Sequence, residues 1–276
     1  MTWSARLKLD YTRSDERCVV FDRHEGPLRV LASLYPESAQ VCHNVLVHPP
    51  GGLVGGDALH IEVNLAARCH ALLTTPGATR FYRSQGKPAS QTLTAHAAGG
   101  ARLEWLPQET LCRRGAIAEN RMSFELEPGA EMIGWDILAL GLPASGEDFD
   151  HGRMTQTLAL NRFWLEHGVI DGADRRLLDS PLGFGGQRVL GVLWCGAGAA
   201  LDSSRREALL DAARQASAAH SLHATTGCTS PHEQVVLLRS LAPRVEPLMQ
   251  LFSAVWALWR PLAWGLPACT PRVWRT

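Results

Sequence analysis

The sequence lacks the features that mark membrane, secreted and nucleic-acid-binding proteins. Lysine plus arginine and aspartate plus glutamate both number 27 among 276 residues, so no net charge favours nucleic acid or an anionic membrane. No apolar stretch reaches the roughly 18 residues of a membrane span, and no basic start followed by an apolar run resembles a secretion signal. We therefore expect a cytoplasmic protein without a nucleic-acid or membrane partner.

Signatures of catalysis and of tight metal binding are also missing. The seven cysteines are scattered and include no C-x-x-C pair, which disfavours a disulfide framework and a structural zinc site. The chain has no G-x-S-x-G elbow, no H-E-x-x-H motif and no G-x-G-x-x-G motif that opens a helix. Its eleven histidines are scattered singly. We therefore expect no catalytic residues and no tightly bound cofactor.

Short alternating or β-branched runs closed by Gly, Pro or Asn fill residues 41–170, and this pattern is typical of strands joined by tight turns. Pro76 and Pro107 are 31 residues apart, and Trp105 and Trp135 are 30 apart. A fixed period in this range indicates stacked β coils, with chance alignment as the alternative. We predict a mainly β protein, a β-helix-like stack of short strands, in a single domain. The three strand–turn–strand units are 61–76, 91–107 and 122–135.

Two α-helices are expected in the C-terminal half of the chain. The first follows a capping Ser203 and has apolar residues at helical spacing opposite a charged face. The second follows Pro247 and is apolar around most of its circumference, so it must be buried or bound on nearly every side. Trp256 and Trp259 in this helix are candidates for a partner interface, with packing in the core as the alternative.

Acidic residues in unusual surroundings are the best candidates for a functional site. Asp57 ends the segment 48–57, whose four glycines and two prolines form either a purely structural double turn or a shaped site. Asp136 lies in an apolar run, where a carboxylate needs hydrogen bonds, a cation or a water-filled cavity. Asp171 lies in a predicted turn, where a solvated role is the default.

Five segments of the sequence form distinctive motifs in a fixed order: 48–57, 75–84, 103–109, 135–147 and 271–274. Together they resemble the urease accessory protein UreD family, also called UreH. The resemblance implies a β-helical, cytoplasmic protein that is not an enzyme. It also implies binding to UreF and, through UreF, to the GTPase UreG, and docking of the assembly on apo-urease for nickel insertion. A departure from the family pattern lies at 112–115.

The same resemblance implies a water-filled internal passage, lined by carboxylates, through which nickel moves in transit. Asp57 and Asp136 match the family positions best, Thr79 matches a small hydroxyl position beside the passage, and Asp171 matches by approximate alignment only. Spaced carboxylates with water bind nickel weakly enough to release it, as a pathway requires. Two alternatives remain: an adaptor that activates urease without carrying nickel, and a β-helical hydrolase or lyase, which the lack of an acid pair disfavours.

Overall fold

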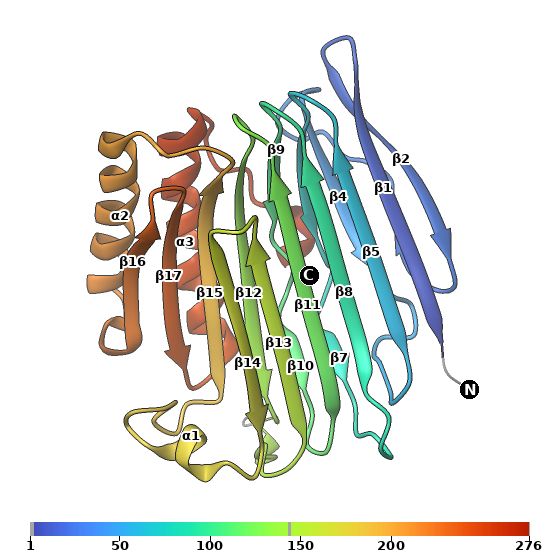
Figure 1. Ribbon diagram of the computed structural model, residues 1–276, viewed down its shortest axis with the longest axis vertical. Coiled ribbons are helices and arrows are strands. Elements are labelled where there is room, and N and C mark those ends of the chain that lie inside the picture. The colour runs from blue at the N-terminus through green and yellow to red at the C-terminus, as the bar shows by residue number, and fades with distance from the viewer. Residues whose placement is uncertain (1–2, 143–144, 276) are drawn as a thin grey trace.

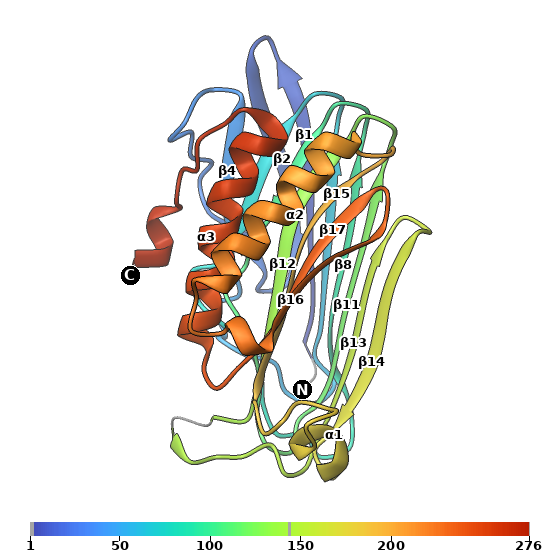
Figure 2. The same cartoon turned by 90° about the vertical axis from the view of Figure 1, so that its left-hand side faces the viewer.

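The computed structural model describes residues 3–142 and 145–275. Two large β-sheets pack face to face, and helices lie against one outer face (Figure 1, Figure 2). The strands are β1 (Ser4–Ser14), β2 (Arg17–Glu25), β3 (Arg29–Val30), β4 (Val41–Val47), β5 (Ala58–Leu65), β6 (His70–Thr74), β7 (Thr79–Phe81), β8 (Ala89–Ala97), β9 (Arg102–Trp105), β10 (Thr110–Cys112), β11 (Ile117–Leu126), β12 (Glu131–Leu140), β13 (Arg153–Leu160), β14 (Trp164–Asp171), β15 (Val189–Ala197), β16 (Thr226–His232) and β17 (Val235–Ala242). The helices are α1 (Arg175–Asp179), α2 (Ser203–Ala218) and α3 (Val245–Trp264), with the 3₁₀ turns η2 (His223–Thr225) and η3 (Arg272–Arg275).

The three predicted units are present as β5 with β6, β8 with β9, and β11 with β12. The first strand of each unit lies in a seven-stranded sheet and the second in a ten-stranded sheet, and each pairs in parallel with its counterpart in the next unit. The chain therefore winds as a β-solenoid-like stack of about 4 turns. The prediction of a mainly β, β-helix-like fold is confirmed.

Equivalent positions of successive coils stack in the space between the two sheets. Leu93 lies opposite Ile61 on one side and Met122 on the other. Leu7 and Leu158 extend this row in both directions, and all five side chains are buried. Because each such side chain contributes about 1.5–3 kcal/mol when it leaves water, the rows of apolar residues hold the coils in register.

The coil corners repeat with the strands. Backbone hydrogen bonds close the turns Ala66 to Cys69, Ala98 to Ala101 and Glu127 to Ala130. The third residue of each turn has a positive φ: Arg68 at 62°, Gly100 at 75° and Gly129 at 86°. Glycine adopts this conformation without a steric penalty, which explains why two of the three corners carry the predicted Gly turns.

One part of the predicted alignment is shifted by a residue. The sequence interval places Trp105 against Trp135, whereas the structure pairs Trp105 with Gly134. Successive side chains of a strand point to opposite faces, so Trp105 lies between the sheets and Trp135 lies under the helices. Gly134 also leaves room for the indole of Trp194, which a Cβ atom at that position would overlap.

The two predicted helices are α2 and α3, and both cover the ten-stranded sheet (Figure 2). The cap of α2 differs from the expectation, because the Asp202 carboxylate, rather than Ser203, accepts the backbone N–H groups of Ser204 and Arg205. The five-residue α1 is additional and is too short to give a helical periodicity. None of the helices in the described part of the chain combines the length and apolarity that a bilayer span needs.

A buried ion network fixes α3 to the sheet. The guanidinium of Arg260, which is 0% exposed, donates to Glu104 on β9 at 3.1 Å and to Glu37 at 2.8 and 2.9 Å. The imidazole of His70 lies 2.7 Å from Glu104, and that of His43 lies 2.7 Å from Glu37. Buried charges are retained only when they are paired and hydrogen-bonded, so this network defines where α3 packs.

Candidate functional site

A row of amide side chains crosses the mainly apolar space between the sheets. Gln91 on β8, Asn120 on β11 and Gln156 on β13 occupy matching register positions of adjacent parallel strands. Asn120 is 1% exposed, and the amide nitrogen of Gln91 lies 3.5 Å from its Oδ1. Since buried polar groups need partners, three stacked amides mark a polar region inside the sandwich.

Asp136 enters this region from the opposite sheet, on β12. Its side chain is 5% exposed, and Oδ2 accepts a hydrogen bond from the Gln156 amide. Loss of solvation raises the pKa of Asp136 to about 7, and the negative charge of Glu166 adds to the effect. Among the described residues, no Lys, Arg or His forms an ion pair with this carboxylate. Asp136 is therefore a buried acid that a cation would stabilise in its charged form.

Asp136 borders two spaces. The first, here named the inner cavity, has a volume of about 260 Å³ and reaches the exposed loops at Gly51 and Gly77. The second, here named the outer groove, has a volume of about 870 Å³ and reaches the exposed residues of β14. Asp136 lines both. The polar residues of the inner cavity are His48, Thr75, Thr79, Arg80, Gln91, Gln108, Thr110, Asn120 and Asp136.

The outer groove lies where the two sheets end in edge strands. It runs between β14 on one side and β15, β16 and β17 on the other. The guanidinium of Arg239 donates to Glu166 at 2.6 Å, so one ion pair joins the two sheets at this groove. Leu165 and Val169 on β14 are exposed. The groove thus combines apolar walls with a charged pair and with Asp136.

The candidate residues from the sequence have different positions. Thr79 lines the inner cavity, as Asp136 does. Asp57 is buried, but its two oxygens accept backbone N–H groups of Trp3 at 2.8 Å and Val54 at 2.9 Å. It does not line the inner cavity, and it closes the loop that precedes β5.

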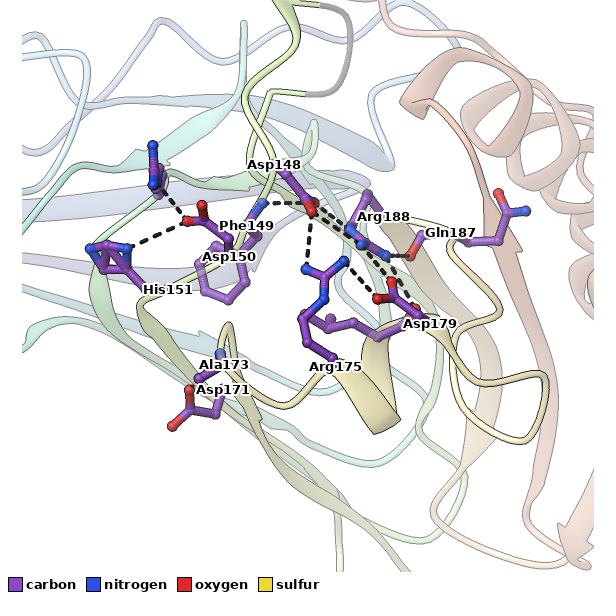
Figure 3. Close-up of polar contacts among 12 residues, drawn as sticks. Asp148, Phe149, Asp150, His151, Asp171, Ala173, Arg175, Asp179, Gln187 and Arg188 are labelled. Atoms are coloured by element: carbon purple, nitrogen blue, oxygen red, sulfur yellow. Dashed lines mark hydrogen bonds and ion pairs between the residues drawn. The ribbon is translucent and has the colours of Figure 1, made fainter.

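Asp171 is exposed at the end of β14, where its carboxylate accepts the backbone N–H of Ala173 at 2.9 Å. It lines neither the inner cavity nor the outer groove. Figure 3 shows Asp171 apart from a neighbouring cluster of ion pairs. The structure therefore brings Asp136 and Thr79 together and leaves Asp57 and Asp171 outside.

That cluster surrounds Arg188 (Figure 3). Arg188 donates to Asp148 at 2.6 Å and to Asp179 at 2.8 Å, and Arg175 bridges the same two carboxylates. The hydrogen bond from Arg188 lowers the pKa of Asp148 to about 2. The cluster ties the α1 segment to the connection between β12 and β13. Nearby, Arg113, in the segment that departs from the family pattern, forms a two-pronged pair with Glu147.

Trp256 and Trp259 are buried in the core between α3 and the sheet. The Trp256 indole N–H donates to Glu104 at 2.6 Å, and that of Trp259 donates to the carbonyl of Leu209 on α2 at 2.8 Å. Both are at most 1% exposed. In this conformation neither ring is accessible to a partner, and both rings pack in the core.

Sequence reasoning missed the amide row. Gln91, Asn120 and Gln156 occupy inward positions in strands whose other inward residues are apolar. The signal in the sequence was an amide at an inward position where an apolar residue is expected, at equivalent positions of successive units.

No group of three or more His, Cys, Asp or Glu side chains within residues 3–142 and 145–275 is arranged to hold a metal ion.

The fold and interior define a β-solenoid-like protein with a polar region between its sheets. The family model described as UreD urease accessory protein matches residues 4–275. The chain is 55% identical over 276 residues to a protein of Variovorax paradoxus (strain S110), covering all of both chains. It is 56% identical over 274 residues to one of Paracidovorax citrulli (strain AAC00-1), covering 99% of each. Both are named urease accessory protein UreD. The chain belongs to the UreD urease accessory protein family.

Proposed function

We propose that this chain is a non-enzymatic scaffold of urease maturation and that nickel passes through the space between its two sheets. The observation that carries the proposal is that Asp136 lines both the inner cavity and the outer groove. A path through the protein would lead past this carboxylate. In this proposal the nickel ion is cargo in transit and is not a tightly bound ligand of the protein.

The chemistry of the lining suits a cation in transit. Carboxylate, amide and hydroxyl oxygens are weaker ligands for nickel than clustered imidazole or thiolate groups. A volume of about 260 Å³ exceeds the roughly 30 Å³ that one water occupies in the liquid, so the ion could keep part of its hydration shell. Asp136 would supply negative charge at the centre of the path.

The partners in this proposal are UreF, UreG bound through UreF, and apo-urease, in the cytoplasm. The family assignment supports a role with urease. The outer groove and the loops at the inner cavity are the two places where cargo could enter and leave, so partners would have to cover them for a sealed path.

The test is Asp136→Asn, because the asparagine amide has nearly the same shape and can still accept the Gln156 hydrogen bond. The tagged chain is co-purified with UreF, UreG and apo-urease, and urease activation is followed after nickel addition. Asp211→Asn, on the exposed face of α2, is the matched control. We expect an intact complex with the variant and a loss of activation of at least about tenfold, the scale on which metal-site contacts act.

Activation equal to wild type in an intact complex would refute the passage and leave the adaptor reading, in which the chain changes the conformation of urease and carries no nickel. Failure of the wild-type chain to form any complex with these partners would refute the scaffold role itself.

A further inference from the structure

A histidine lines the inner cavity beside its oxygen-bearing side chains. His48 follows the last residue of β4 directly and begins the Gly- and Pro-rich loop 48–57. It lines the inner cavity together with Thr79 and Asp136. The Nε2 atom is buried and has no hydrogen-bond partner among the described residues.

An unpaired buried ring nitrogen is unfavourable unless a ligand or water satisfies it. Trp105 lines the same cavity, and its indole N–H is also buried with no partner in the part of the chain that the structure describes. Both residues line one polar cavity, so a small rotation of either ring would let its nitrogen meet a polar ligand or water there. Burial lowers the pKa of His48 despite the nearby charge of Asp57, so the imidazole is neutral at pH 7 and can offer a lone pair to a metal ion.

Asp57 has a different task in the same loop. Both of its oxygens accept backbone N–H groups, one from Val54 within the loop and one from Trp3 before β1. A carboxylate used in this way fixes the path of the loop that carries His48.

We propose that His48 Nε2 is the nitrogen contact for nickel, or for a similar borderline divalent cation, in the inner cavity, and that Asp57 is a positioning residue for this imidazole. This inference rests on the proposed passage and deepens it. Since no three-ligand cluster exists among the described residues, the contact is a single one, completed by water and by oxygen atoms of the lining. Such a contact slows the ion without trapping it.

The first test uses nickel alone. Histidine side-chain resonances of the ¹⁵N-labelled chain are followed during addition of substoichiometric NiCl₂, whose paramagnetism broadens nearby nuclei. The His48 signals are identified as those that disappear in His48→Gln. The signals of His60, an exposed histidine on β5, are identified in the same way with His60→Gln. We expect the His48 signals to broaden at least as early as those of His60, although His48 is less exposed. Broadening confined to His60 and other exposed histidines would overturn the proposal.

The second test separates this inference from the passage itself. In the reconstituted activation assay, His48→Gln should slow the initial rate about tenfold or more at limiting nickel, the scale expected for a metal contact, with the complex intact and His60→Gln unaffected. Asp57→Asn should slow it as well, and Ni²⁺ should then broaden the His48 signals less. Normal activation with His48→Gln, beside lost activation with Asp136→Asn, would refute the role of His48 and keep the passage. Normal activation with both would refute both, and loss of complex assembly with His48→Gln would show that the residue is structural.

Discussion

Asp136→Asn should make the protein more stable at neutral pH while it removes a function. Burial raises the pKa of the Asp136 carboxyl to about 7, against 3.8 for an aspartate side chain in water. The folded state therefore binds this proton more tightly than the unfolded state does. The contribution to stability is fully present below about pH 3.8, is lost as the pH rises towards 7, and stays lost above that value.

The magnitude follows from the interval between the two pKa values. Each pH unit in that interval is worth about 1.4 kcal/mol, so the ionised carboxylate destabilises the folded chain by about 4 kcal/mol at pH 8. The asparagine amide is neutral at every pH and can keep the hydrogen bond from Gln156. The difference in free energy of unfolding between variant and wild type should therefore grow from near zero at pH 4 to about 4 kcal/mol at pH 8.

The assay is urea unfolding followed by tryptophan fluorescence at several pH values, with the slope m compared between proteins. Subtracting wild type from variant removes the titration of all other groups. Asp211→Asn, whose side chain is exposed, should give a difference that is small throughout. A flat difference curve for Asp136→Asn would refute the reasoning, because it would mean that the carboxylate is solvated or paired in the folded chain. A variant that is more stable and yet inactive would exclude unfolding as the cause of lost activation.

Two further substitutions test the packing that frames the site. Gly134→Ala should destabilise the chain by about 1–3 kcal/mol, because the added Cβ overlaps the Trp194 ring. Gly168→Ala, in β14 with open space around it, should be near neutral. Equal effects of the two substitutions in urea unfolding would contradict this explanation. Arg260→Met should cost about 3–5 kcal/mol by removing the guanidinium that pairs with Glu37 and with the buried Glu104. Arg214→Met removes an exposed ion pair with Asp211 on α2, at 3.6 Å, and should cost less than about 1 kcal/mol. If Arg260→Met cost as little, the buried network would not hold α3.

The sequence predicted the repeat, the turns and both long helices because each leaves a local signal. Gly100 and Gly129 mark coil corners through backbone conformation alone. The apolar residues of α3 were expected to be covered on nearly every side, but only the face toward the sheet and α2 is buried, and Leu258 and Leu262 are exposed. The one-residue error at Trp135 has a physical cause: successive units differ in length, so a constant interval between tryptophans does not give the strand register. The positions of Asp57 and Asp136 relative to the cavities depend on contacts between segments far apart in the chain. No local pattern in the sequence contains that information.

The contrast between Asp57 and Asp136 shows why a motif match alone is a poor guide to a role. Both were the best motif matches in the sequence. Among the described residues, however, one carboxylate accepts two backbone N–H groups, whereas the other accepts one amide and borders two spaces. Only the second retains unused acceptor capacity where a cation could approach. The amides of Gln91, Asn120 and Gln156 add oxygen atoms to the proposed path without adding charge. One carboxylate among neutral ligands would attract nickel and still release it, whereas a second unpaired carboxylate beside it would strengthen binding and slow transfer.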